Sequence, residues 1–219
     1  MSLQVLLFDL DGTLVDSAPG LADTANDLRA SRGQPPLPYA ALRPGAGSGA
    51  RGMLSVAFDL RPGDAGYDPL RDEFLDRYPL RMLEKARLFD GVRALITRIE
   101  TAGLRWGIVT NKAIRFAEPL CAAMGLVPHA GALVGGDSTP HTKPHPAPLI
   151  EATRRLCVPS AACAYVGDDE RDMRAGRAAG MRTIAAAWGY LGHDAVINEW
   201  PADHVAAAPD GVLKFIELA

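Results

Sequence analysis

Short apolar segments alternate with stretches of helical periodicity over most of the chain. Four apolar runs predict buried strands, at residues 5–10, 106–111, 162–168 and 182–188. Two shorter runs predict edge strands, at 132–134 and 204–207. The segments between them predict helices, at 91–102, 112–124, 146–156, 169–179 and 209–218. This succession of strand, helix and strand is typical of an α/β fold with a parallel sheet covered by helices on both faces.

Residues 16–88 interrupt this alternation. They show no convincing strand, and Pro- and Gly-rich segments separate their helical stretches near 20–32, 49–58 and 69–86. We therefore predict a helical domain at 16–88, inserted after the first strand of a core that comprises residues 1–15 and 89–219.

Composition narrows the class of protein. Of the 219 residues, 48% are hydrophobic, which is enough to form a sizeable core. The net charge of −3 gives no sign of a basic face for nucleic acid. No apolar run reaches the ~18 residues that a membrane span needs, and the scattered cysteines indicate free thiols in a reducing compartment. We expect a cytoplasmic protein, monomeric or homodimeric, that binds neither nucleic acid nor membrane.

The first polar motif, FDLDGTLVDS (8–17), places Asp9 and Asp11 at the end of the first predicted strand. Two carboxylates at such a point can divide the work of phosphoryl transfer. One attacks phosphorus and forms an aspartyl-phosphate, and the other exchanges a proton with the leaving group and with water. Taken alone, the same pair also fits a solvated turn.

Two further junctions carry groups that bind phosphate. Thr110 and Asn111 end the second main strand, where a hydroxyl and an amide can hold phosphate oxygens beside a helix N-terminus. An ordinary helix cap would explain them better if they stood alone. Lys143, in the proline-rich segment HTKPHPAP (141–148), can neutralise both the nucleophile and the phosphoryl oxygens. A solvated surface lysine is the alternative.

The fourth motif, YVGDDERD (165–172), supplies three carboxylates: Asp168, Asp169 and Asp172. Carboxylate oxygens suit Mg²⁺, although acids at a helix N-terminus also complement the helix dipole. Each motif is ambiguous alone. Together they supply a nucleophile, an acid/base, a phosphate-binding hydroxyl, a cation and metal-binding acids, and this conjunction predicts phosphoryl transfer.

The ordered motifs DLDGTLVDS, VTNK, KPHP and GDDERD resemble those of the haloacid dehalogenase superfamily over essentially the whole chain. The resemblance implies a Rossmann-like parallel-sheet core with an inserted helical cap domain. It also implies that Asp9 is the nucleophile and Asp11 the acid/base, and that Thr110 and Lys143 are the catalytic pair that binds phosphate.

The resemblance further implies the metal site. Mg²⁺ would be held by Asp9, Asp168 and the backbone carbonyl of Asp11, and Asp172 would orient Lys143 or a metal-bound water. Asp169 stands where the family often has serine, so the resemblance leaves open whether Asp169 contacts the metal or its waters.

Within the superfamily, the chain resembles the phosphoglycolate phosphatase group. The segments TNKAIRFAEPL, RLFDGV and WGY are more similar to bacterial N-acetylmuramic acid 6-phosphate phosphatases. Both substrates carry a carboxylate, and the core motifs do not separate them. We expect the cap to determine specificity through the loop GAGSGARGML (45–54), where the planar guanidinium of Arg51 matches a carboxylate. A surface arginine without a partner is the alternative.

Other functions fit the same fold. A sugar phosphomutase would use the same core groups. A dehalogenase is disfavoured because attack on carbon does not need Asp11 to protonate a leaving alkoxide. A non-catalytic binding protein is disfavoured because every expected catalytic side chain is present. The sequence therefore predicts Mg²⁺-dependent hydrolysis of a small phosphorylated metabolite.

Overall fold

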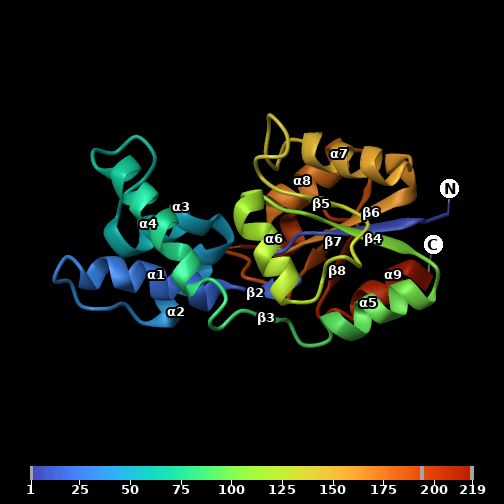
Figure 1. The fold of residues 1–219 in the computed structure, drawn as a ribbon. Helices are drawn as coiled ribbons and strands as arrows, with labels where there is room; N and C mark the ends of the chain where they lie inside the picture. The colour runs from blue at the N-terminus through green and yellow to red at the C-terminus, as the bar shows by residue number, and fades with distance from the viewer. Residues whose placement is uncertain (1, 193–194, 218–219) are drawn as a thin grey trace.

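The central element of the fold is a six-stranded parallel sheet (Figure 1). The computed structural model describes residues 2–192 and 195–217. Within them the strand order is β5–β4–β1–β6–β7–β8, and each neighbouring pair is parallel. The strands are β1 (Val5–Phe8), β4 (Arg105–Val109), β5 (Leu133–Val134), β6 (Cys163–Gly167), β7 (Arg182–Ala186) and β8 (His204–Ala206). The α/β fold class predicted from the sequence is confirmed.

Helices cover both faces of the sheet, as β1 illustrates. Leu6 and Phe8 belong to one apolar core, and Val5 and Leu7 belong to the other. Helices α7 and α8 pack on the face of Val5 and Leu7, whereas α5, α6 and α9 pack on the opposite face. The helices are α5 (Val92–Thr101), α6 (Ile114–Ala123), α7 (Ala147–Leu156), α8 (Glu170–Ala178) and α9 (Gly211–Glu217). Burial on both faces explains why β1 is apolar without alternation.

The cap, which we define as the helices between β2 and β3, lies beside the sheet (Figure 1, left). It consists of α1 (Ala18–Ala30), α2 (Tyr39–Leu42), the 3₁₀ helix η1 (Arg43–Ser48), α3 (Gly49–Phe58) and α4 (Tyr67–Arg81). The inserted helical cap predicted from the family resemblance is thus present. Its Pro- and Gly-rich segments were predicted only as separators, but one of them forms η1.

A short antiparallel ribbon connects the cap to the core. Strands β2 (Val15–Asp16) and β3 (Arg87–Leu88) pair with each other and with no strand of the large sheet. The prediction that residues 16–88 contain no strand is therefore wrong at both ends of the segment. Two-residue strands are too short to leave an alternating pattern in the sequence.

Tyr190 fixes the start of the cap from the far end of the chain. Its hydroxyl accepts hydrogen bonds from the backbone N–H groups of Ser17 and Ala18, at 2.8 and 2.9 Å. These groups begin α1, where no intrahelical acceptor exists and the side chain of Ser17 supplies none. The Tyr190 side chain is almost fully buried, so water does not provide a substitute.

We expect Tyr190→Phe to lower the free energy of unfolding by about 1–3 kcal/mol, because two buried N–H groups lose their acceptor while the ring remains. Urea unfolding would measure the change. The control is Tyr39→Phe, which removes a hydroxyl from a side chain at the exposed surface of the cap. Equal stabilities of the two variants would contradict the capping role of Tyr190.

Candidate active site

Three of the predicted motifs meet at one edge of the sheet. Asp9 follows β1, Thr110 follows β4 and Asp168 follows β6, and β1 lies between the other two strands. Because neighbouring parallel strands end side by side, the sheet itself brings these residues together. Strand β1 ends two residues earlier than predicted, so Asp9 is the first residue beyond it. Lys143 reaches the same point from the loop before α7.

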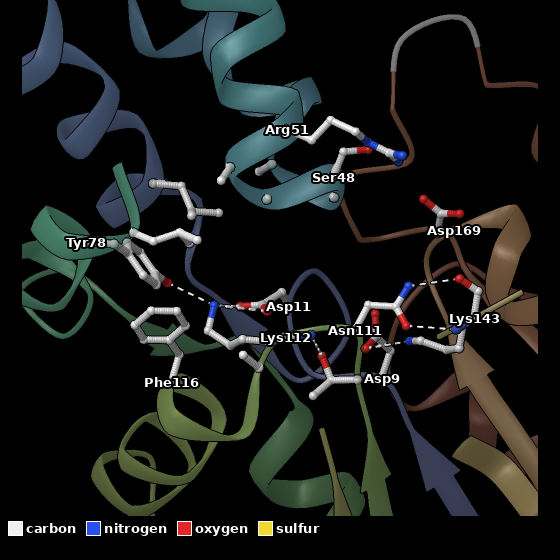
Figure 2. Close-up of a pocket in the computed structure, with 18 of the residues that line it drawn as sticks. Asp9, Asp11, Ser48, Arg51, Tyr78, Asn111, Lys112, Phe116, Lys143 and Asp169 are labelled. Carbon is white, nitrogen blue, oxygen red and sulfur yellow. Dashed lines mark hydrogen bonds and ion pairs between the residues drawn. The ribbon is translucent and has the colours of Figure 1, made fainter. Parts of the chain in front are cut away.

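A pocket of about 330 Å³ opens over this edge, between the core and the cap (Figure 2). The core lines it with Asp9, Asp11, Thr110 and Lys143. The cap lines it with residues 46–50, where η1 ends and α3 begins, and with Arg51. We call the following side chains of the pocket the apolar wall: Leu21, Phe74, Leu75 and Tyr78 from the cap and Phe116 from the core. The pocket therefore has a charged end and an apolar side.

The ammonium of Lys143 is the positive centre of the charged end. Its Nζ lies 2.8 Å from Asp9 Oδ1 and 2.7 Å from Asp172 Oδ1, and it donates to Tyr165 Oη at 2.8 Å. Burial lowers the pKa of Lys143, but Asp172 and Asp9 raise it more, so that the net pKa lies above its usual value. The lysine therefore stays charged and compensates two buried carboxylates at once.

Asn111 holds the backbone of Lys143, and Thr110 holds the turn that follows β4. The Asn111 side chain donates to the Lys143 carbonyl at 3.0 Å and accepts from the Lys143 N–H at 2.9 Å. The Thr110 hydroxyl accepts from the backbone N–H of Lys112 at 3.2 Å and lines the pocket. Asn111 thus fixes the backbone of the catalytic lysine candidate. Phosphate binding by Thr110 and Asn111 stays a prediction.

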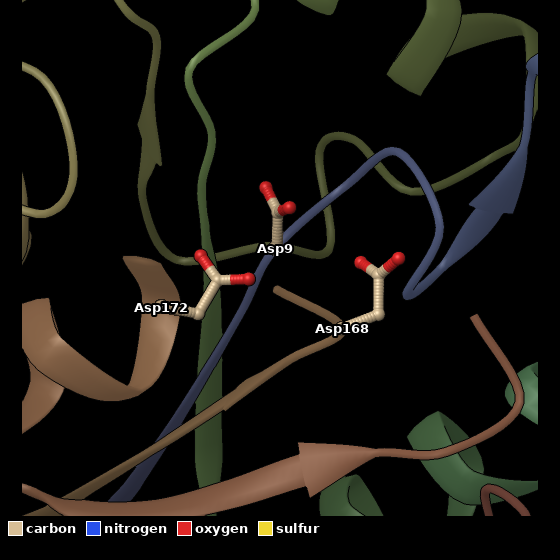
Figure 3. Close-up of side chains that lie close together, drawn as sticks. All are labelled: Asp9, Asp168 and Asp172. Atoms are coloured by element: carbon tan, nitrogen blue, oxygen red, sulfur yellow. The ribbon is translucent and has the colours of Figure 1, made fainter. Parts of the chain in front are cut away.

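Asp9, Asp168 and Asp172 form a buried carboxylate cluster (Figure 3). One carboxylate oxygen from each lies within 4.8 Å of those of the other two. Asp172 also accepts from the backbone N–H of Asp169 at 3.1 Å, and its other oxygen faces Lys143. This contact is compatible with the implied role of Asp172 in orienting Lys143.

The carboxylate cluster fits a divalent cation. Burial and the charges of Asp9 and Asp172 raise the pKa of Asp168 well above its usual range. Asp9 Oδ1 is buried, and the Lys143 ammonium that it faces at 2.8 Å is shared with Asp172. A hard cation such as Mg²⁺ binds carboxylate oxygens. It would offset both the repulsion among the three carboxylates and the burial of Asp9 Oδ1.

Gly12 allows the loop after β1 to pass close to this cluster. Its φ of +88° favours glycine, and a Cβ atom at this position would overlap the carboxylate of Asp168. Asp168 is held in place by the Thr13 hydroxyl, which donates at 2.9 Å, and by the Tyr190 N–H, which donates at 2.8 Å. Tyr190, whose hydroxyl accepts from the first N–H groups of α1, therefore also supports the carboxylate cluster through its backbone N–H.

Asp169 contacts an arginine through both carboxylate oxygens. Oδ1 accepts from the Arg171 backbone N–H and from Nε, each at 2.8 Å, and Oδ2 accepts from Nη2 at 2.7 Å. Burial raises the pKa of Asp169, but Arg171 lowers it by more, so that the net pKa lies below its usual value. Arg171 Nη2 also donates to the Gly47 carbonyl of the cap at 2.8 Å. Asp169 therefore holds an arginine that joins core and cap.

Asp11 is paired with a second buried lysine, Lys112. The Lys112 Nζ lies 3.1 Å from each carboxylate oxygen of Asp11 and 2.9 Å from the hydroxyl of Tyr78 in the cap. Figure 2 shows this chain from Tyr78 through Lys112 to Asp11.

Arg51 lies on the cap side of the pocket, opposite Asp9 (Figure 2). Its side chain is exposed, and no hydrogen bond or ion pair joins it to another residue in the part of the chain that the structure describes. Arg71 and Arg115 also line the pocket. The cap side thus offers an unpaired guanidinium to an anionic ligand, whereas its role in specificity stays a prediction.

The site also contains Lys112, Tyr165 and Arg171, to which the sequence motifs assigned no role. Lys112 immediately follows the TN pair, and Arg171 lies inside GDDERD, so proximity to the motifs was the available signal. Tyr165 is the one hydroxyl-bearing side chain in the buried strand CAYVG, which is an unusual place for a polar group.

Known proteins show which family the chain belongs to. A family model described as haloacid dehalogenase-like hydrolase matches residues 3–180. A phosphoglycolate phosphatase of Xanthomonas campestris pv. campestris (strain 8004) is 45% identical over 207 residues, which cover 94% of this chain and 93% of the relative. An N-acetylmuramic acid 6-phosphate phosphatase of Pseudomonas putida is 40% identical over 219 residues, which cover 100% and 98%.

Solved structures share the fold. The crystal structure of a predicted phosphoglycolate phosphatase from Haemophilus somnus 129pt matches with a TM-score of 0.86 and 25% identity, over 98% of both chains. A predicted phosphatase from Clostridium acetobutylicum, 20% identical, matches with a TM-score of 0.81 over 100% of both chains and supports the fold alone. None of the helices in the described residues combines the length and apolar character that a membrane crossing requires. The chain therefore belongs to the haloacid dehalogenase-like hydrolase family, and its relatives support the predicted enzyme class of phosphoric monoester hydrolase.

Proposed function

We propose that the protein hydrolyses a small phosphomonoester through an aspartyl-phosphate on Asp9. The observation that carries this proposal is the placement of Asp9, which lies against Lys143 and beside Asp168 at the charged end of the pocket. A carboxylate held in this way has an oxygen directed at the ligand space and a fixed cation to receive the phosphoryl oxygens.

The chain's own residues divide the reaction into two steps. Asp9 attacks phosphorus, the ester P–O bond breaks, and Asp11 gives a proton to the leaving oxygen. Asp11 then takes a proton from water as the water attacks the aspartyl-phosphate, which releases phosphate and restores Asp9. Lys143 and Thr110 stabilise the charge on the phosphoryl oxygens in both steps. Mg²⁺, held by Asp9, Asp168 and the Asp11 carbonyl, would supply further charge neutralisation.

We propose a phosphoglycolate phosphatase-like activity, supported by relatives of that name and by the free guanidinium of Arg51, which can pair with a carboxylate. A second candidate is N-acetylmuramic acid 6-phosphate. The apolar wall favours it, because phosphoglycolate offers only a methylene group to such a surface. In either case residues 16–88 would act as the domain that determines specificity. A cytoplasmic location and the oligomeric state remain predictions from the sequence.

Phosphate release by the purified protein tests the activity directly. We expect turnover with Mg²⁺, loss of turnover with EDTA, and a preference of ~100-fold in kcat/KM for one of the two substrates, equivalent to about 2.7 kcal/mol of transition-state binding. Slow turnover of both would exclude both as physiological substrates, and no release from any phosphoester would exclude the phosphatase.

We expect Asp9→Asn to reduce kcat by at least ~10³-fold without unfolding the protein, because the amide removes the nucleophile with little change in shape. Steady-state kinetics and circular dichroism would measure both effects. Asp59→Asn is the matched control, since Asp59 is exposed and asparagine tolerates its φ of 52°. Substantial turnover by folded Asp9→Asn would disprove the mechanism.

We expect Arg51→Ala to raise KM about tenfold for a carboxylate-bearing substrate and to leave KM for p-nitrophenyl phosphate nearly unchanged. The reason is the loss of a charge-assisted hydrogen bond worth about 1.5–3 kcal/mol. Arg61→Ala, at an exposed position elsewhere in the cap, is the control. An equal change in KM for both substrates would remove Arg51 from the specificity role.

A further inference from the structure

Lys112 is buried in the wall of the pocket, where all its donors are used. Its side chain is 8% exposed, and that of its partner Asp11 is 16% exposed. The ammonium has three N–H donors. Two face the carboxylate oxygens of Asp11, each at 3.1 Å, and the third is directed to Tyr78 Oη at 2.9 Å. A substrate group could bind Lys112 only by displacing Asp11 or Tyr78.

Tyr78 is itself held by packing, so its hydroxyl is a fixed acceptor. The residue lies on α4 of the cap and is 2% exposed. Its ring stacks on Phe74 with 6.2 Å between centroids and meets the edge of Phe116 at 5.5 Å. The Lys112 ammonium also lies 4.8 Å from the centre of the Tyr78 ring, within the range of a cation–π contact. Phe116 belongs to the core, and therefore the contact spans both domains.

Asp11 receives a further donor from the connection between core and cap. The hydroxyl of Ser17 donates to Asp11 Oδ1, and Ser17 directly precedes α1. The carboxylate is therefore held by Lys112 and by Ser17. Without these donors, a side chain in the turn after β1 would be free to rotate. Proton transfer requires the carboxyl oxygen to lie within hydrogen-bond reach of the reacting oxygen, and a misplacement of about 1 Å can cost 10²-fold in rate.

We propose that Lys112 is a positioning residue that orients the Asp11 carboxylate, and that its bond to Tyr78 makes this orientation depend on the position of the cap. This inference rests on the proposed function, in which Asp11 exchanges protons with the leaving group and with water. Lys112 does not touch the substrate. Orientation of Asp11 explains why a second buried lysine lies next to the site, although Lys143 already compensates the charge of the phosphate.

The leaving group provides a sharp test. A phenolate needs a proton from Asp11 as it leaves, whereas p-nitrophenolate is a stable anion that leaves without one. We would measure the rate of the first turnover on phenyl phosphate and on p-nitrophenyl phosphate for wild type, Lys112→Met, Tyr78→Phe and Lys85→Met. The last variant is the control, because Lys85 is an exposed cap lysine that also pairs with an aspartate.

For Lys112→Met we expect a loss of ~100-fold on phenyl phosphate and of less than ~3-fold on p-nitrophenyl phosphate. Tyr78→Phe keeps the ring and removes one acceptor, so we expect the same pattern with a loss of ~10-fold on phenyl phosphate. The substrate concentration that gives half of the maximal first-turnover rate should change little in either variant. Lys85→Met should match wild type on both substrates.

Other results would overturn the inference. Equal losses on both substrates would indicate a general electrostatic or folding effect, and no loss would show that Asp11 needs no orientation by Lys112. Weaker binding of both phenyl phosphates with an unchanged rate of the first turnover would make Lys112 a substrate-binding residue. In all these cases the wild type is active, so the proposed function stands. A wild type that releases neither phenol contradicts the proposed function, and the inference fails with it.

Discussion

The carboxylates of Asp9, Asp168 and Asp172 repel one another at a point from which water is largely excluded, and the surrounding structure offsets that repulsion. Lys143 contributes the compensating charge, and its own backbone is fixed by Asn111. Neutral donors from both ends of the chain complete the arrangement, since Thr13 and the Tyr190 N–H bind Asp168. The same electrostatic cost is what a metal ion would remove. A site that is costly without its ligand is suited to binding both a cation and a phosphoryl group.

The sequence predicts the core of this site well because its parts lie at strand ends. Asp9, Thr110 and Asp168 each follow an apolar run, and the parallel sheet brings such positions together regardless of how far apart they lie in the chain. What the sequence does not show is which polar side chains meet across space. Lys112 and Tyr78 are 34 residues apart, and neither the residue types nor their spacing indicates the bond between them.

Asp169 is a second residue whose contacts the sequence does not show. Because Asp169 stands where the family often has serine, its extra charge left open a contact with the metal or its waters. In the structure both oxygens of Asp169 bind Arg171, and Arg171 extends to the Gly47 carbonyl. Polar contacts therefore join the cap to the core at several places, among them the bond from Arg171 to Gly47 and the bond from Lys112 to Tyr78. Asp169 in place of the family's serine is thus explained by Arg171, two positions later, which compensates its charge. A comparison of motifs does not reveal such a pair.

The ribbon of β2 and β3 has a consequence for how such proteins diversify. The chain leaves the core at Val15–Asp16 and returns at Arg87–Leu88, and these residues pair directly, so both ends of the insertion lie one strand spacing apart. The entropy of closing a loop rises only slowly with loop length, and the core therefore tolerates insertions of different sizes at this point. Such an insertion leaves the backbone connection to Asp9 unchanged, whereas each cap has to supply its own acceptor for Lys112, as Tyr78 does here. The same core reaction can in this way be combined with caps that bind chemically unrelated substrates.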